Sequence, residues 1–453
     1  MTRRRKYDRQ SGSNDGRGVN RRRFLAGIGA GATATSLAGC LGGGGGGGGG
    51  GGNGSGGGSG DSVKIGAVFL LSGLAEALGQ ASRAGAELGV QHVNENGGIN
   101  GQDVEIVFRD HDSNGAAGPI TSLVQEENVD VLIGLTSSGA TLQAAPTMEQ
   151  LGVPMTLTDI GTPWITEFDE EKYGDEKAAG IPNLFRTNAN TTINTYAMAK
   201  YAVEELDVTR VANIGPDYAY GTQTWDYFKA FADALGGEFE YVESVFPTLG
   251  ASDMTPQINQ VLAANPDLVF TSFWAGDAVT FVQQATEQGL FDQVDDVFDT
   301  LGADPTVFEA LGTTMPEGVH YSSWYWHSAY DNQENQDFVQ AYKDANGGSL
   351  PSFTGPTTFS AIQIYKKAIE AAGSTEPDAI ISEMEGMSHT GPRGEWTLDA
   401  DSHQASAPTI IGETSKDDDV PYEGVGLKPV QSVSLDKQEA YDLLKGTDLP
   451  PGM

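Results

Sequence analysis

The chain has 453 residues and a formal net charge of −36 at pH 7, from 26 Lys and Arg against 62 Asp and Glu. A surface this acidic repels phosphate backbones, so nucleic acid is excluded as a partner. The dispersed acids favour adaptation to molar salt, where screening over about 3 Å removes most self-repulsion, over an acidic tail that buffers cations. The single cysteine excludes an intrachain disulfide, and the length allows two lobes of ordinary domain size.

Residues 1–39 have the pattern of an export signal. Arg21-Arg22-Arg23 precedes a short apolar stretch at 24–37, which is typical of a twin-arginine signal peptide. Leu37-Ala38-Gly39-Cys40 then resembles a lipobox, in which the Cys40 thiol is acylated and becomes the new amino terminus. We therefore expect removal of 1–39 and a lipid anchor on Cys40. An ordinary buried cysteine is disfavoured because a glycine tract follows it directly.

Residues 40–60 form the expected linker, almost entirely Gly with a few Ser and Asn. Such a chain is a flexible coil with an r.m.s. reach of about 25 Å. Beyond residue 39 no apolar run approaches the roughly 18 residues needed to cross a bilayer. The sequence thus predicts a body tethered to the outer face of the cell membrane.

Strand and helix patterns alternate along the first part of the body. Strand patterns lie at 63–71, 104–108, 129–133 and 153–157, and helical patterns at 75–96, 116–127 and 141–151. A looser stretch at 159–190 predicts a crossing to a second lobe. The alternation indicates an α/β protein with a parallel sheet and helices on both faces.

The same rhythm restarts in the second part of the body. Helices are expected at 193–205, 222–235, 254–264 and 278–288, and strands at 210–214, 239–245, 268–273 and 294–298. A strand at 319–326 then crosses back, and helices at 336–345 and 358–372 rejoin the first lobe. This predicts two doubly wound parallel-sheet lobes. The tail, 416–453, is expected to pack on the second lobe or run loose.

Ligands of such sheets bind beyond the carboxyl ends of strands, and the cleft between two lobes is the default site. Thr136-Ser137-Ser138-Gly139 offers hydroxyls and backbone N–H groups just before a predicted helix. That arrangement suits a carboxylate or an amide oxygen. A simple helix cap is an equally good interpretation of the same residues.

Short motifs run through the body, among them Ile65-Gly66-Ala67-Val68, Leu71-Ser72-Gly73, the segment 93–101, Phe185-Arg186-Thr187 and Tyr218-Ala219-Tyr220-Gly221. Over residues 61–415 they resemble the leucine/isoleucine/valine-binding proteins, the type I solute-binding proteins of ABC transporters. The resemblance implies two lobes joined by a three-crossover hinge, which close on a ligand like a trap and perform no chemistry. With it, lobe 1 is expected at 61–188 and 322–400, and lobe 2 with the tail at 189–321 and 401–453.

The resemblance also implies a ligand site. Leu78 falls where an apolar residue covers the ligand side chain, and Ser137 or Ser138 where a serine holds the ligand carboxylate. The loop expected to hold the ammonium and carboxylate contains Asp159, Gly161 and Thr162.

Two aromatic residues of lobe 2, Tyr220 and Trp274, fall at positions that close over the ligand. Ordinary packing between the lobes is the alternative for both. By the same resemblance, Leu301 stands where the family commonly has a glutamate for the ligand ammonium. A zwitterionic ligand then needs another anion, because a buried unpaired ammonium costs several kcal/mol. Asp159 is the best substitute, with Asp299 and Asp304 behind it; failing these, the ligand is an amide, urea or an organic acid.

Other signals are weaker. Asp110 to Gly115 matches the first half of a calcium loop, but Thr121 stands where a bidentate Glu is required, which favours a solvated turn. The six histidines show no paired metal spacing, so neither a metal nor a cofactor is expected. Trp324-Tyr325-Trp326 is assigned to hinge or core packing rather than to ligand contact.

The predicted function is that of an extracytoplasmic, lipid-anchored, monomeric receptor of an ABC importer. It would capture a branched-chain amino acid or related small polar solute and deliver it to the permease subunits. A sensory receptor of the same fold is the alternative. An exported hydrolase is disfavoured because the body has no motif that pairs a nucleophile with a base.

Overall fold

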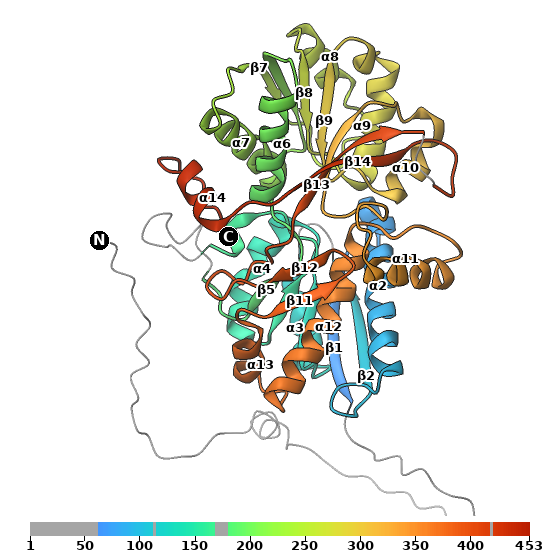
Figure 1. The fold of residues 1–453 in the computed structure, drawn as a ribbon, viewed down its shortest axis with the longest axis vertical. Coiled ribbons are helices and arrows are strands. Elements are labelled where there is room, and N and C mark those ends of the chain that lie inside the picture. Colours follow the sequence, from blue (N-terminus) through green and yellow to red (C-terminus); the bar gives the residue numbers. More distant parts are fainter. Residues whose placement is uncertain (1–61, 112–114, 168–179, 417–419) are drawn as a thin grey trace, which may run out of the picture. The chain divides into compact units, whose positions relative to one another are not determined.

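The computed structural model describes residues 62–111, 115–167, 180–416 and 420–453. These residues contain two main sheets flanked by helices (Figure 1). The first sheet has five parallel strands in the order β2-β1-β3-β4-β5. Its strands are β1 (Val63–Phe69), β2 (Val104–Asp110), β3 (Val131–Gly134), β4 (Met155–Leu157) and β5 (Leu184–Arg186).

Strand β1, which lies between β2 and β3, is buried at all but one of its positions, because helices cover both faces of a parallel sheet. The helices that accompany this sheet are α2 (Glu76–Glu95), α3 (Ala117–Gln125), α4 (Ser138–Leu151), α11 (Gln333–Ala345), α12 (Thr354–Ala372) and α13 (Pro377–Met384). Helices α2 and α12 touch closely at Gly85, where a Cβ atom would lie 2.4 Å from the Gly355 carbonyl oxygen. This contact fixes the start of α12 beside the ligand cavity described below.

The second sheet has seven strands in the order β14-β13-β10-β9-β8-β6-β7. They are β6 (Arg210–Ile214), β7 (Glu240–Val245), β8 (Leu268–Thr271), β9 (Asp296–Thr300), β10 (His320–Ser323), β13 (Thr409–Ser415) and β14 (Gly426–Val433). Strand β13 runs antiparallel to both of its neighbours, and the other pairs are parallel. The accompanying helices are α6 (Thr191–Glu205), α7 (Ala219–Ala234), α8 (Thr255–Ala263), α9 (Ala275–Glu287) and α10 (Pro305–Leu311).

The chain passes between the sheets three times. It leaves the first sheet after β5, leaves the second after β10, and returns to it at β13 after the hairpin of β11 (Ser388–Gly391) and β12 (Gly394–Thr397). The predicted fold class, two doubly wound lobes joined by three crossings, is confirmed. The strand expected at 319–326 ends at Ser323 and belongs to the second sheet. The lobe limits given above remain a proposal.

The tail is more ordered than the sequence indicates. It contributes β14 to the second sheet, and α14 (Lys437–Leu443) packs on α7. Residues 450–453 are buried beside the first crossing, where the Pro451 carbonyl accepts a hydrogen bond from Thr192 (2.7 Å). Gly452 N–H donates to the Glu167 carboxylate at 3.3 Å.

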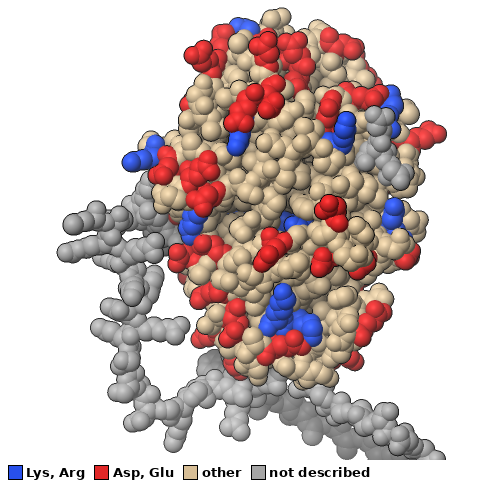
Figure 2. Space-filling view, viewed as in Figure 1, with Lys and Arg blue, Asp and Glu red and all other residues tan. Residues whose placement is uncertain are grey.

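The surface follows the composition. Figure 2 shows Asp and Glu side chains spread over the face in view, with few Lys and Arg among them. Within the described part of the chain, no helix is long and apolar enough to cross a membrane. The predicted signal, Cys40 and the linker all lie outside the described residues, and so do residues 112–114 of the half calcium loop.

Candidate functional site

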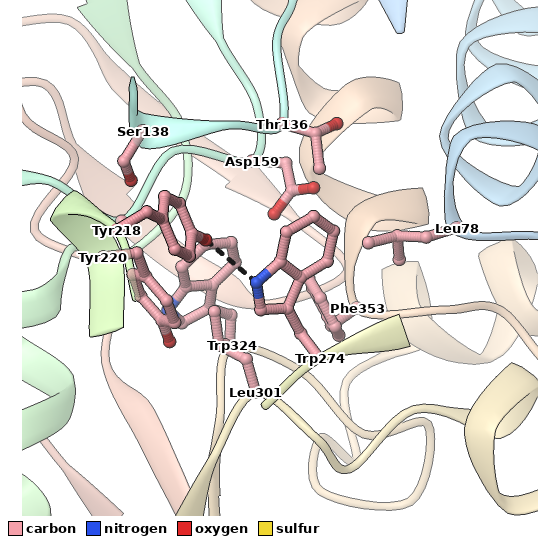
Figure 3. A pocket seen from close by; sticks show the side chains of 11 residues that line it. Leu78, Thr136, Ser138, Asp159, Tyr218, Tyr220, Trp274, Leu301, Trp324 and Phe353 are labelled. Atoms are coloured by element: carbon pink, nitrogen blue, oxygen red, sulfur yellow. Dashed lines mark hydrogen bonds between the residues drawn. The ribbon is translucent and has the colours of Figure 1, made fainter. Parts of the chain in front are cut away.

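A cavity with about 280 Å³ of empty space lies where loops from both sheets meet (Figure 3). Its walls come mainly from loops that follow the carboxyl ends of β1, β3, β4, β6, β8, β9 and β10. This is where parallel α/β sheets present unpaired backbone groups and variable side chains to ligands. The eleven lining residues are Leu78, Thr136, Ser138, Asp159, Gly161, Tyr218, Tyr220, Trp274, Leu301, Trp324 and Phe353.

The wall from the first sheet carries the polar groups. Ser138 is the first residue of α4, and its hydroxyl oxygen accepts a hydrogen bond from Thr162 N–H at 3.2 Å. The hydroxyl hydrogen of Ser138 can then be donated to a ligand. The Thr136 hydroxyl is buried and lies close enough to Asp159 to lower the pKa of that carboxyl. Two hydroxyls therefore face the cavity next to the amino end of a helix, which favours anionic or carbonyl oxygens.

Asp159 supplies the acid of the same wall. Its side chain is 5% exposed, and Oδ2 has no hydrogen-bond partner within the described residues. Burial raises the pKa of the Asp159 carboxyl well above its usual range; the Thr136 hydroxyl opposes this only in part, and the nearby Asp304 adds to it. None of the eleven lining residues is Lys, Arg or His. The ionised carboxylate therefore needs a positive partner from outside the chain.

Arg186 holds the loop on which Asp159 lies. The guanidinium donates from Nη1 to the carbonyl oxygens of Ile160 (2.9 Å) and Thr162 (2.8 Å), and from Nη2 to Thr166 Oγ1 (2.5 Å). Burial lowers the Arg186 pKa to about 9, so the group still carries its charge at neutral pH. The sequence showed Arg186 only as part of a motif, and its role as a clamp on the ligand loop becomes visible in three dimensions.

The wall from the second sheet is aromatic. Tyr218 and Tyr220 stand at the start of α7 with ring centroids 6.2 Å apart, and Trp274 Nε1 donates to the Tyr218 hydroxyl at 2.9 Å (Figure 3). The Tyr220 ring packs on Gly161 of the opposite wall, where a Cβ atom would lie 2.6 Å from the ring. Tyr220 and Gly161 thus bring the two walls into direct contact.

Two further aromatic side chains complete the enclosure. Trp324 follows β10, Phe353 precedes α12, and their rings meet edge to face with centroids 5.3 Å apart. The sequence assigned Trp324 to packing; it belongs to the hydrophobic core and also lines the cavity. Tyr218, Phe353 and Thr136 were not among the predicted site residues. Thr136 stood in the segment 136–139 that suits a carboxylate, and Tyr218 stood in a motif of the resemblance, whereas Phe353 had no signal in the sequence.

Backbone strain gathers around the same loops. Leu135, Ala275 and Leu301 have φ angles of 66°, 48° and 68°, in the left-handed region that non-glycine residues seldom adopt. They follow β3, β8 and β9 respectively. Each such conformation costs on the order of 1–3 kcal/mol and is retained mainly at functional sites.

Seven of the nine predicted ligand residues line the cavity, namely Leu78, Ser138, Asp159, Gly161, Tyr220, Trp274 and Leu301. Ser137 and Thr162 do not. Ser137 accepts from Ala140 N–H at 3.3 Å and caps α4, and Thr162 accepts from Trp164 N–H at 3.3 Å and caps a short 3-10 turn at Pro163–Ile165. That these seven residues bind a ligand remains a prediction.

The two alternative acids lie outside the cavity lining. Asp299 accepts a hydrogen bond from Gly302 N–H at 3.2 Å. Asp304 caps α10 through Thr306 N–H (2.9 Å) and accepts from Ser352 Oγ (2.5 Å) at the start of α12. Of the three candidate acids, Asp159 alone faces the cavity. The described residues contain no group of three metal-binding side chains.

A model of the periplasmic binding protein family matches residues 62–419. The chain belongs to this family. The Leu/Ile/Val-binding protein homolog 3 of Brucella melitensis is 25% identical over 323 residues, covering 71% of this chain and 82% of the relative. Members of the family bind solutes and are not enzymes, and this chain is a substrate-binding protein of the leucine/isoleucine/valine-binding kind.

Two solved structures share the fold. A leucine-binding protein from Thermotoga maritima superposes with a TM-score of 0.69 and 24% identity, covering 80% of this chain and 98% of the other. A solute-binding protein from Rhodopseudomonas palustris in complex with 3,4-dihydroxybenzoic acid gives a TM-score of 0.72 and 23% identity, covering 83% and 98%. Proteins with this fold therefore accept chemically different ligands.

Proposed function

We propose that this protein is a lipid-anchored receptor of an ABC importer, which captures a small amino-acid-like solute between its lobes and delivers it to the permease. The observation that carries the proposal is Asp159, a buried acid with an unpartnered oxygen that shares a cavity with an aromatic wall. A branched-chain amino acid or a related small zwitterion supplies the positive group that this acid needs.

The two walls suit the two ends of such a ligand. The carboxylate would bind at the amino end of α4, with the Ser138 hydroxyl as donor. The positive group would pair with Asp159, and Leu78, Tyr220 and Trp274 would cover the apolar part. The names of the Brucella relatives and of the Thermotoga protein support this ligand class.

An organic acid, amide or urea is the second candidate. It is favoured by the five aromatic lining residues and by the raised pKa of Asp159, since a protonated carboxyl can donate a hydrogen bond to a ligand oxygen. The dihydroxybenzoic acid complex of the Rhodopseudomonas protein supports this alternative.

Delivery would take place outside the cytoplasm. We propose that residues 1–39 are removed, that Cys40 carries the lipid, and that the glycine-rich linker lets a monomeric body reach the permease subunits. A sensory role with the same ligand trap is the alternative, and a signalling partner would then replace the permease.

The test is a thermal-shift screen of the full chain in molar salt against amino acids, amides, urea and aromatic acids. A ligand at 100 times its Kd adds about 2.7 kcal/mol of stability, which shifts the melting temperature measurably. We expect a shift with at least one small solute, and we expect it to vanish in Asp159→Asn for a cationic ligand. If no compound shifts the melting temperature, the proposed function is wrong.

A further inference from the structure

The surroundings of Asp159 are unusually poor in hydrogen-bond acceptors. Among the buried side-chain atoms of the cavity, Asp159 Oδ2 is an acceptor without a hydrogen-bond partner in the described part of the chain, and Trp324 Nε1 is a donor without one. The Tyr218 hydroxyl already accepts from Trp274, and the Ser138 hydroxyl already accepts from Thr162 N–H. The Gly161 carbonyl accepts from Thr191 N–H at 2.8 Å.

Aromatic rings take up most of the remaining wall. The Tyr218–Tyr220 pair, the Trp324–Phe353 pair and Trp274 line the same cavity as Asp159 (Figure 3). The exposed fraction is 6% for Trp274 and 0% for Trp324. Water is therefore excluded from both the acid and the rings, a condition under which cation–π attraction is strongest.

A buried carboxylate surrounded by aromatic rings favours some kinds of ammonium group over others. A primary ammonium is compact, strongly hydrated and has three donors to satisfy, so its burial among rings leaves donors unpaired. An alkylated ammonium has few or no N–H groups, presents methyl surface, and gains from both a carboxylate and aromatic faces. The geometry points to a quaternary or otherwise N-alkylated ammonium solute as the ligand class, held by Asp159 inside a box formed by Tyr218, Tyr220, Trp274, Trp324 and Phe353.

The inference rests on the proposed function and narrows its ligand. A carboxylate on the same solute is compatible with it, because Ser138 and the amino end of α4 lie in the same cavity. The raised pKa of Asp159 agrees with it as well, since burial makes the ionised carboxylate dependent on a cation.

The experiment compares probes of equal shape and different charge by calorimetry on the full chain. N,N,N-trimethylglycine is tested against 3,3-dimethylbutanoate, in which carbon replaces the quaternary nitrogen, and against glycine. Tetramethylammonium is added as a cation without a carboxylate, and leucine as a primary ammonium. We expect trimethylglycine to bind at least about tenfold tighter than its anionic isostere, which lacks the positive nitrogen, and than glycine.

Two variants of Trp274 test whether its aromatic ring causes the preference for trimethylglycine. Trp274→Phe retains an aromatic face, whereas Trp274→Leu retains apolar bulk without one. We expect the preference for trimethylglycine over 3,3-dimethylbutanoate to survive in Trp274→Phe and to fall by about tenfold in Trp274→Leu. Thermal melts without ligand control for folding, and a Trp274→Leu protein that keeps the full preference would contradict a role for this ring.

The remaining outcomes separate this inference from the proposed function. Equal binding of the anionic isostere, or failure of both methylated ammonium compounds while leucine binds, overturns the alkylated-ammonium ligand and leaves the amino-acid receptor intact. Binding of aromatic acids alone overturns it in favour of the second candidate. If neither these probes nor the wider screen yields a ligand, the proposed function falls together with it.

Discussion

The two walls of the cavity are built by the same strand-loop-helix geometry, yet they carry different chemistry. Loops of the first sheet contribute Thr136, Ser138 and Asp159, whereas loops of the second contribute Tyr218, Tyr220 and Trp274. The polar wall can orient a ligand by hydrogen bonds and charge before the lobes meet. The aromatic wall adds contact area only when the two lobes come together. In a hinged trap of this kind, the first lobe would orient the ligand and the second lobe would close over it.

The difference predicts how each wall responds to change. When the acid of the polar wall is removed, the cation of the ligand is left buried without a partner. This lowers the binding free energy more than the loss of an apolar contact does. An aromatic wall loses area and some shape complementarity. The predictions below run from the polar wall to the aromatic wall and then to the contacts that close them.

Asp159→Asn is expected to have the largest effect, with opposite signs on binding and on stability. Affinity for a cationic solute should fall by about 2–5 kcal/mol. The stability of the unliganded protein at pH 7 should rise. Burial raises the pKa of Asp159 in the folded state, so the folded protein loses stability as the pH rises above the unfolded pKa of about 4, and the Asn variant avoids this loss. Calorimetry and thermal melts without ligand measure the two effects.

Asp299→Asn is the matched control for this prediction. Asp299 is also buried with a raised pKa, since burial outweighs its hydrogen bond from Gly302, but it lies outside the cavity lining. Affinity should stay within about twofold of the unmodified chain, as for a substitution with no shared partners. A large loss in Asp299→Asn and none in Asp159→Asn would reverse the assignment of the ligand acid.

The aromatic wall is tested by Tyr220→Ala and Trp274→Ala. Each should weaken ligand binding by about 1–3 kcal/mol without unfolding the chain, because both side chains lie at the centre of a desolvated contact. Titration calorimetry gives the affinity, and circular dichroism reports whether the fold is retained. Unchanged affinity in both variants would mean that these rings pack the lobes together and do not touch the ligand.

A contact between α9 and the turn that follows β1 lies outside the cavity lining and can be changed without altering a cavity residue. Gly276 lies in the first turn of α9, and a Cβ there would lie 2.8 Å from Leu74 Cδ1 and 3.1 Å from the Leu74 carbonyl oxygen. Gly276→Ala favours the helix but opposes the closed state, so affinity should fall by about 1 kcal/mol while thermal stability is retained. Small-angle scattering should show the unliganded protein more open.

Leu74→Ala provides the rescue for Gly276→Ala. Leu74 is 39% exposed, so its truncation costs little stability. In the double variant the clash with the side chain of Leu74 is removed, and affinity should recover in part. Failure of any rescue, together with normal closure in scattering, would show that this contact does not limit closure.

Some strands and helices could be predicted from the sequence, and others could not. Most of the alternating elements from β1 to β9 were predictable because buried strands and amphipathic helices carry strong periodic signals. Strand β5 was not, since it lies within 159–190, which the sequence assigned to a crossing. Strands β13 and β14 were not, since they are antiparallel additions at one side of the second sheet, and β14 contains Pro429, which an edge strand tolerates. Both strands mix Gly, Pro or polar residues with apolar ones, so neither shows a clear strand period in the sequence.

Some residues of the cavity could likewise be predicted from the sequence, and others could not. Asp159, Ser138 and Trp274 follow directly from family positions at strand ends, and the structure places all three in the cavity. Ser137 and Thr162 each lie one residue from a cavity residue, Ser138 and Gly161 respectively. That one-residue difference makes them cap a helix or a 3-10 turn instead of lining the cavity. Phe353 and Trp324 belong to the second crossing of the chain, so only the relative placement of the two sheets shows that they line the cavity.

The smallest expected effect, proton exchange with solvent, distinguishes the two candidate ligand classes most sharply. In the free protein burial raises the Asp159 pKa, and a bound cation would lower it again. Binding of a cationic solute should therefore release protons, and affinity should rise with pH until the carboxyl is ionised in the free protein too. An organic acid that accepts a hydrogen bond from protonated Asp159 requires the reverse, proton uptake and an affinity that falls with rising pH. Calorimetry in two buffers of different ionisation enthalpy measures the sign, and binding without any proton exchange would show that Asp159 does not contact the ligand.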